Sequence, residues 1–232
     1  MFNVNTKTSE YMTIVVTHLC NRRCPFCVDK YRGLNEYITL DDVDKALNFA
    51  SENKIKDILL VGGEPTLHPQ IVKIASMCYN KKFNIILTTN YSKPEIVREL
   101  DKFVNSFNIS YYGQENLPNS DEFSADITLS TLIHKKQLKS KKELDKFIDE
   151  YSSKFILKFS TLVDCNDWTR SNKKVNYLDK LDSDKVVLFD EMLGQIYRGC
   201  VIKRYDKILF KNSKQSYKCL VNGLISTSWD RD

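Results

Sequence analysis

The chain has 232 residues, of which 42% are hydrophobic and 28% charged. This composition is typical of a globular protein and excludes a disordered chain, and no apolar run approaches the roughly 20 residues that span a bilayer. The N-terminus lacks the pattern of a signal peptide, so we expect a cytoplasmic protein with no membrane partner. The net charge of +5 comes from lysines scattered among Asp and Glu, which gives no reason to expect a nucleic-acid partner.

Strand-like and helix-like segments alternate over the first two thirds of the chain. Strands are predicted at 11–17, 57–61, 83–89, 105–111, 125–133 and 155–162, and helices at 41–52, 69–80, 94–103 and 141–151. Thr39 is the expected N-cap of the first helix. Strands joined by helical crossovers form a parallel sheet. A complete eight-unit barrel takes about 250 residues, so six units in about 160 predict an α/β fold with an open, partial (β/α)6 barrel.

The pattern changes after Leu162. Residues 163–183 are polar and predict a loop or lid, and β-prone runs follow at 185–189, 194–202, 207–210 and 224–229 without helical spacers. We therefore expect a core barrel at 1–162. Residues 163–232 are expected to form the lid loop and a small, antiparallel, C-terminal β-rich extension that completes the substrate pocket.

Three of the seven cysteines lie in the stretch CNRRCPFC, directly after the first predicted strand. Cys20, Cys24 and Cys27 have the spacing C-x3-C-x2-C. Seven is an odd number, and a reducing compartment disfavours disulfides, so this spacing indicates metal binding or a redox role. A structural zinc site needs four ligands, whereas three thiolates suit a [4Fe–4S] cluster with one open iron. Zinc bound with the help of His18, or an incidental cluster of cysteines without a metal, remain alternatives.

A second motif, VGGEPTLHP, spans residues 61–69 at the end of the second predicted strand. Its two glycines allow the backbone to approach a ligand closely, and Glu64 places a carboxylate at the same edge of the sheet. A G-G-E segment is weak evidence by itself. It becomes strong evidence together with the cysteine motif, because both follow the carboxyl ends of parallel strands, where ligands bind in such folds.

These two motifs resemble those of the radical S-adenosylmethionine (radical SAM) superfamily, and the resemblance covers about residues 11–162. It implies that Cys20, Cys24 and Cys27 hold a [4Fe–4S] cluster whose fourth iron binds S-adenosylmethionine. It also implies that one electron, from a donor such as flavodoxin or ferredoxin, cleaves the sulfonium bond. The resulting 5′-deoxyadenosyl radical would then abstract hydrogen from the substrate, a step that requires no acid–base pair and no nucleophile, so no catalytic residue is assigned.

The resemblance also implies the residues that contact the cofactor. Phe26 stands where the family places an aromatic residue against adenine, and Gly62, Gly63 and Glu64 match the segment that binds the methionine amino group. Thr89 and Asn90 match the first two residues of a T-N-G motif, although Tyr91 replaces the glycine. Ser110 matches the serine of an S-x-D-G pattern, although this chain has S-Y-Y-G and lacks the aspartate.

The sequence says less about the substrate pocket than about the cofactor site. An apolar barrel interior that protects the radical is expected from Ile109, Leu129, Ile156 and Phe159. The candidates for the substrate pocket are Tyr111, Tyr112, Cys165, Asp167, Trp168 and Arg170, and His134 stands at a strand end from which it can face the pocket. Cys78, Cys165, Cys200 and Cys219 are expected to pack in the protein rather than to hold a second cluster.

We therefore expect a radical enzyme that acts on a small molecule or a short peptide. Activation of a glycyl-radical enzyme is an alternative, because such activases share the cysteine spacing. A non-catalytic zinc-binding or interaction module is an alternative from a different class, and a metal analysis that finds zinc in place of iron and sulfide would favour it.

Overall fold

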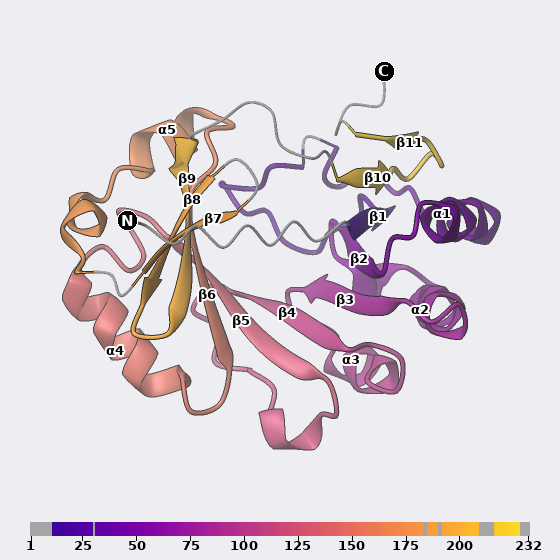
Figure 1. Ribbon diagram of the computed structural model, residues 1–232, viewed down its shortest axis with the longest axis horizontal. Helices are drawn as coiled ribbons and strands as arrows, with labels where there is room; N and C mark the ends of the chain where they lie inside the picture. The colour runs from indigo at the N-terminus through magenta and orange to yellow at the C-terminus, as the bar shows by residue number, and fades with distance from the viewer. Residues whose placement is uncertain (1–10, 30, 183–184, 190–191, 209–215, 228–232) are drawn as a thin grey trace.

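The computed structural model describes residues 11–29, 31–182, 185–189, 192–208 and 216–227. Its strands form one curved, mixed sheet in the order β11-β10-β1-β2-β3-β4-β5-β6-β9-β8-β7 (Figure 1). The strands are β1 (Tyr11–Thr17), β2 (Asp57–Gly62), β3 (Asn84–Thr89), β4 (Ser106–Tyr111), β5 (Asp126–Ile133), β6 (Ile156–Thr161), β7 (Lys185–Phe189), β8 (Met192–Tyr197), β9 (Cys200–Ile208), β10 (Tyr217–Cys219) and β11 (Ile225–Ser226).

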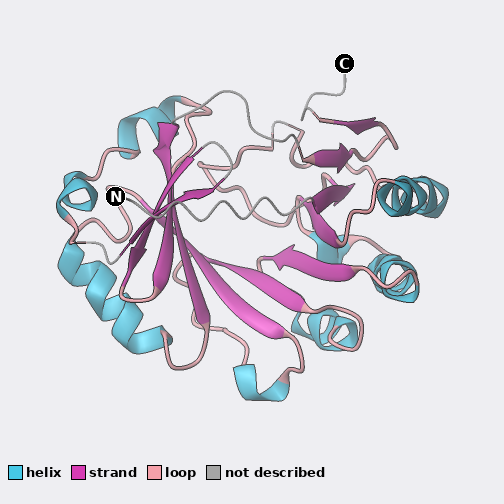
Figure 2. Ribbon diagram, viewed as in Figure 1, coloured by secondary structure: helices cyan, strands magenta, loops and turns pink. Residues whose placement is uncertain are grey.

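The six central strands, β1 to β6, are all parallel, which confirms the predicted partial barrel. The helices are α1 (Leu40–Glu52), α2 (Ile71–Asn80), α3 (Pro94–Leu100), α4 (Lys141–Tyr151) and α5 (Asp167–Asn172). They lie on the outside of the curved sheet (Figure 2). Thr39 caps α1 as predicted, accepting a hydrogen bond from the Asp42 amide at 3.1 Å. The second helix begins at Ile71 rather than at Pro69, because the intervening Gln70 is its N-cap.

Three of the four apolar residues expected inside the barrel face the helices instead. Ile109, Leu129 and Phe159 are fully buried in the core that includes the helices, and the Phe159 ring contacts Phe147 of α4 at 5.7 Å. Ile156 is 56% exposed. The expected apolar interior is therefore wrong, because alternate residues of a strand point to opposite faces and an apolar run does not reveal which residues face inward.

The opposite, concave face of the late strands carries a row of polar residues. Register places Ser110 of β4 beside Ser130 of β5, and Ser130 beside Lys158 of β6. All three alternate with the buried positions that face the helices. We call this surface the inner face. Hydroxyl groups and a lysine, rather than hydrocarbon, line this part of it.

The C-terminal strands extend both edges of the sheet. β7, β8 and β9 are antiparallel to one another, and β9 joins β6 in parallel. At the other edge, β10 joins β1 in parallel and pairs with β11 antiparallel. The β-rich character is thus confirmed, whereas the division at residue 162 stays an expectation. Of the predicted runs, residues 209–210 and 228–229 lie outside the described residues.

The segment after β6 is not the simple loop that its polar composition predicts. It contains α5 and a 3-10 helix at Asn176–Lys180. A capping box starts α5: the Thr169 amide donates to Asn166 Oδ1 at 2.9 Å, and the Asn166 amide donates to Thr169 Oγ1 at 3.0 Å. Six residues are too few for a helical period to show in the sequence. Among the described residues, no helix is long and apolar enough to cross a bilayer.

Candidate cofactor site

A cavity of about 220 Å³ opens at the carboxyl ends of β1 to β4. All ten residues that the sequence assigns to the cluster and the cofactor line it, namely Cys20, Cys24, Phe26, Cys27, Gly62, Gly63, Glu64, Thr89, Asn90 and Ser110. They come from four strand ends that are up to 90 residues apart in the chain (from Cys20 to Ser110). The structure therefore brings the predicted site residues together in one pocket.

The three cysteines lie on the loop that follows β1. The loop turns tightly: the Cys27 amide donates to the Cys24 carbonyl at 3.2 Å, and the Arg22 amide donates to Cys20 Sγ at 3.4 Å. Arg32 also donates to the Cys24 carbonyl, at 2.5 Å. Burial raises the pKa of the Cys20 and Cys24 thiols, and the neighbouring cysteines raise it further. The thiolate forms of Cys20 and Cys24 are thus disfavoured in the protein alone, and a bound cation would favour them.

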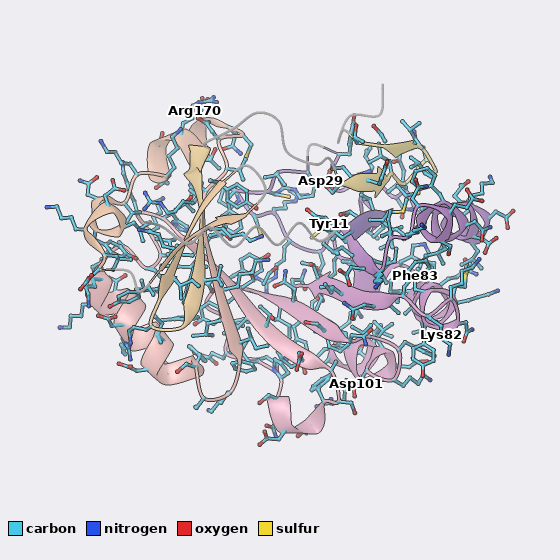
Figure 3. The ribbon with its side chains drawn as sticks, viewed as in Figure 1. Tyr11, Asp29, Lys82, Phe83, Asp101 and Arg170 are labelled. Atoms are coloured by element: carbon cyan, nitrogen blue, oxygen red, sulfur yellow. The ribbon has the colours of Figure 1, made fainter. Side chains whose placement is uncertain are left out.

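The donor set fits an iron–sulfur cluster better than a single ion. In the part of the chain that the structure describes, no three His, Cys, Asp or Glu side chains converge on one point. A cubane cluster does not require such convergence, because each of its cysteines binds a different iron atom. His18, the possible helper for zinc, does not line the cavity, and its Nδ1 lies 2.9 Å from Asp29 (labelled in Figure 3).

The two glycines of the G-G-E segment pack against the end of β1. A Cβ atom at Gly62 would lie 2.3 Å from the Thr17 carbonyl oxygen, and one at Gly63 would lie 2.3 Å from that of Leu19. The Gly63 amide donates to the Thr17 carbonyl at 2.7 Å, and the Glu64 amide to Leu19 at 2.8 Å. The close backbone approach is therefore to the start of the cysteine loop rather than to a ligand, and it fixes that loop relative to Glu64.

Glu64 is 1% exposed, and four donors hold its carboxylate in place. Oε1 accepts from the Thr66 amide at 3.1 Å and from the hydroxyls of Thr66 and Thr89, both at 2.7 Å. Oε2 accepts from the Asn90 amide at 2.7 Å. No described cation forms an ion pair with Glu64, and Oε2 retains room for a further donor. A buried acceptor of this kind suits the ammonium group of an amino acid.

The T-N-Y segment after β3 shows how this chain tolerates its departure from the T-N-G motif. Tyr91 has a φ of 58°, in the left-handed region that glycine adopts without strain. Its side chain is 4% exposed and packs in the core. Asn90 donates through Nδ2 to Asn21 Oδ1 at 2.9 Å, which ties the segment to the cysteine loop. The backbone shape of the motif is thus retained without its glycine.

Phe26 lies among aromatic side chains from three other parts of the chain. Tyr112 stacks on it at 5.7 Å, and the rings of Trp168 and His134 lie at 5.9 and 6.1 Å. The segment before α5 contacts the cysteine loop directly: Asn166 Nδ2 donates to the Pro25 carbonyl at 2.9 Å. The C-terminal third of the chain therefore closes one side of the site.

The predicted pocket residues divide into two groups. Tyr112 lines the cavity, Trp168 contacts Phe26, and Cys165 Sγ lies 3.8 Å from the Cys27 carbonyl oxygen. The remaining three are directed elsewhere. Tyr111 packs against Phe147 and Tyr151 on the helix side, while Asp167 and Arg170 pair with each other at 2.6 Å at the surface, where Figure 3 shows Arg170 on the periphery.

A family model described as the radical SAM superfamily matches residues 14–113. This part of the chain belongs to the radical SAM superfamily. It is 27% identical over 141 residues to a Methanocaldococcus jannaschii protein described as a glycyl-radical enzyme activating enzyme, covering 60% of this chain and 52% of that protein. It is 32% identical over 108 residues to the GTP 3′,8-cyclase of Clostridium acetobutylicum, covering 44% of this chain and 34% of the cyclase. The chain thus spans about half or less of these relatives.

The fold also resembles a solved structure, Streptococcus suis SuiB bound to its precursor peptide SuiA. The TM-score is 0.58 and the identity 19%, over 73% of this chain and 43% of SuiB. At this identity the likeness concerns the fold alone. It agrees with the partial radical SAM barrel described above.

Sequence reasoning missed several residues of this radical SAM site. Arg22, Val28, Arg32 and Thr88 also line the cavity. Arg22 and Arg32 lie inside or just after the cysteine motif, and two cations beside three thiols are a signal that the spacing analysis did not use. Arg22 also stacks on the Tyr112 ring at 4.8 Å.

The four cysteines outside the motif differ in their burial. Cys78, Cys200 and Cys219 are buried as expected, whereas Cys165 is exposed. Cys200 on β9 and Cys219 on β10 lie at opposite sides of the sheet, so they cannot share a second cluster (Figure 1). His134 is 4% exposed; its Nδ1 accepts from the Lys136 amide, and its Nε2 is buried without a partner among the described residues.

Proposed function

We propose that the chain is a radical SAM enzyme that cleaves S-adenosylmethionine reductively and abstracts hydrogen from a small molecule or a short peptide. The observation that carries this proposal is the single cavity lined by all ten residues of the cluster and cofactor motifs. An electron donor such as flavodoxin or ferredoxin would supply the electron.

Each wall of the cavity has a separate task in this proposal. Cys20, Cys24 and Cys27 would hold a [4Fe–4S] cluster with one open iron. Glu64 would accept a hydrogen bond from the amino group of S-adenosylmethionine, and Phe26 would lie against the adenine. When bound, the cluster and S-adenosylmethionine supply reductive cleavage and the 5′-deoxyadenosyl radical.

The chain's own contribution is positioning and the exclusion of water. The hydrogen bonds of Glu64 to Thr66, Thr89 and Asn90 hold the carboxylate in one orientation before the ligand arrives. The aromatic group around Phe26 covers the side of the site that faces α5. Both features reduce the reorganisation that ligand binding requires.

The decisive experiment is an anaerobic assay on reconstituted protein. About four irons per chain are expected for a cubane cluster, and reductant with S-adenosylmethionine should release 5′-deoxyadenosine and methionine. The triple variant Cys20→Ala, Cys24→Ala, Cys27→Ala should lose the iron and the reaction. A matched control, Cys78→Ala, removes a buried core thiol outside the cavity and should keep both. A loaded, reduced protein that releases no 5′-deoxyadenosine would refute the proposal.

A second candidate function is activation of a glycyl-radical enzyme, and the similarity to the Methanocaldococcus jannaschii protein favours it. A glycine-containing peptide deuterated at the α-carbon tests it directly. Label transferred into 5′-deoxyadenosine would support the activase, whereas label transferred only from a small molecule would exclude it. A metal analysis that finds zinc without iron and sulfide would instead support the binding-module alternative.

A further inference from the structure

A lysine lies in the middle of a buried strand of this barrel. Lys158 is flanked on β6 by Leu157 and Phe159, which are 5% and 0% exposed and face the helices. Strand alternation therefore directs Lys158 to the inner face. A charged side chain among buried strand residues is uncommon and requires an explanation.

The register of the sheet connects Lys158 to the cofactor site. Ser110, which lines the cavity, pairs with Ser130, and Ser130 pairs with Lys158. Neighbouring strands lie about 4.8 Å apart, so the Lys158 backbone is roughly 10 Å from that of Ser110 along one row of the inner face. A ligand of ordinary metabolite size can therefore touch Lys158 and the edge of the cavity at once.

A second lysine faces the same side. Lys203 of β9 is beside Ser160 of β6, which makes it a diagonal neighbour of Lys158 on the inner face. Burial, together with the positive charge of Lys203, lowers the pKa of Lys158 to about 8. No described carboxylate offsets this effect on Lys158. The protein thus keeps a poorly hydrated amine beside a second cation.

The neighbours of the two lysines on the inner face are both polar and apolar. Ser130 lies beside Lys158 and Ser160 beside Lys203, whereas Val201 pairs with Lys158 on its other side. Hydroxyl groups and ammonium groups are together the donors that bind carboxylate and phosphate oxygens. An aliphatic ligand would place hydrocarbon against the Lys158 ammonium group, at a free-energy cost.

We propose that Lys158, with Lys203 beside it, binds an oxyanion of the substrate, a carboxylate or a phosphate, and so selects an anionic substrate. This inference rests on the proposed function, because it places the rest of the substrate at the cavity where hydrogen would be abstracted. The bound anion stabilises the ammonium form of Lys158, which the unliganded protein disfavours.

The test uses the full, reconstituted chain and two probes at constant ionic strength, inorganic phosphate and succinate. Each probe is titrated by calorimetry against the wild type and against Lys158→Met, Lys203→Met and the exposed control Lys142→Met. Either lysine variant should raise the dissociation constant of the preferred probe about tenfold or more, whereas the control should not change it. The probe with the larger lysine-dependent affinity identifies the anion as a phosphate or a carboxylate.

Further variants keep the test decisive. Lys158→Arg preserves the charge and should retain most of the affinity, and Lys203→Met provides the result if circular dichroism shows that Lys158→Met does not fold. Equal dissociation constants in the wild type and in the folded lysine variants would overturn the inference, since any binding would then occur elsewhere, for example at Arg22 or Arg32. Cleavage of S-adenosylmethionine by the wild type, measured on the same preparation, tests the proposed function separately.

Discussion

The ends of β1 to β4 and the inner face of β5, β6 and β9 differ in how their polar groups are held. At the early strands, Glu64 has four donors, and Gly63 is hydrogen-bonded to the end of β1. Across the later strands, Lys158 has no described ion pair and the Nε2 atom of His134 has no described partner. The early half is organised before any ligand binds, as a cofactor site requires. In the later half, Lys158 lacks the opposite charge that a bound anion would supply, as a specificity site for an anion requires.

The largest expected effect tests the organisation of the early half. Gly63→Ala places a Cβ atom 2.3 Å from the Leu19 carbonyl oxygen and 2.6 Å from that of His18. Backbone atoms cannot move away cheaply, so we expect a loss of about 3 kcal/mol in the free energy of unfolding. The cysteine loop should move as well, which would lower the iron content. Urea denaturation and iron analysis measure the two effects.

Gly199→Ala is the matched change in the later half. Gly199 has a φ of 75° in the β8–β9 turn, and an added Cβ atom would meet nothing within 4 Å. Only backbone strain remains, which costs about 1–2 kcal/mol. The iron content should not change. If the two variants had equal effects on the iron content, the contrast between the halves would be wrong.

The next effect concerns Glu64. Glu64→Ala removes the acceptor expected for the ammonium group of S-adenosylmethionine, a charge-assisted hydrogen bond that contributes about 1.5–3 kcal/mol. The affinity of the reconstituted protein should therefore fall by about tenfold or more. Thr89→Val removes one hydrogen bond to the same carboxylate without removing its charge, so its effect should be smaller. An unchanged affinity in Glu64→Ala would show that the cofactor lies elsewhere.

The early half could be predicted from the sequence because its functional residues form short motifs at strand ends. Cys20 to Cys27 and Gly62 to Glu64 each lie within eight residues, so each motif is visible in the sequence, and the two together indicate the site. The later half has no such motif. Which of Lys158 and Phe159 faces the ligand depends on the phase of β6. Each face of that strand carries both apolar and polar residues, so the pattern alone does not fix the phase.

Long-range contacts also escaped prediction. Asn166 and the Pro25 carbonyl that it binds are 141 residues apart, and α5 is too short to show a period. One signal was nevertheless present: Lys158 interrupts the run FILKFSTL, where a buried strand has no need for a charge. Charged residues within apolar strands are therefore worth as much attention as motifs.

A smaller effect is expected from the pH dependence of Lys158. Its pKa falls from 10.5 to about 8 in the folded protein, so between these values the unfolded chain binds a proton that the folded chain does not. Stability therefore rises with pH through this window, and the cost of the buried charge is fully present below pH 8. Lys158→Met removes this cost and should be more stable than the wild type by about 1–3 kcal/mol at pH 7.

This advantage should disappear as the pH approaches 10.5. Urea denaturation of both proteins at several pH values measures it. Lys203 contributes to the lowering of the Lys158 pKa. Lys203→Met should therefore also be more stable than the wild type at pH 7, by a smaller amount than Lys158→Met. Parallel pH profiles for the wild type and Lys158→Met would mean that Lys158 is well hydrated, and the contrast between the two halves would lose its main support.

The smallest expected effect comes from a comparison of two changes on opposite sides of α5. Arg170 is exposed and pairs only with acidic residues among its described contacts, Asp164 and Asp167, and exposed ion pairs contribute little. Arg170→Ala should therefore leave both the unfolding midpoint and the release of 5′-deoxyadenosine unchanged. Trp168→Leu, two residues earlier, removes the ring that contacts Phe26 and His134, and it should slow that release. An Arg170→Ala variant that is slower than Trp168→Leu would place the substrate on the outer side of α5, away from the inner face that carries Lys158.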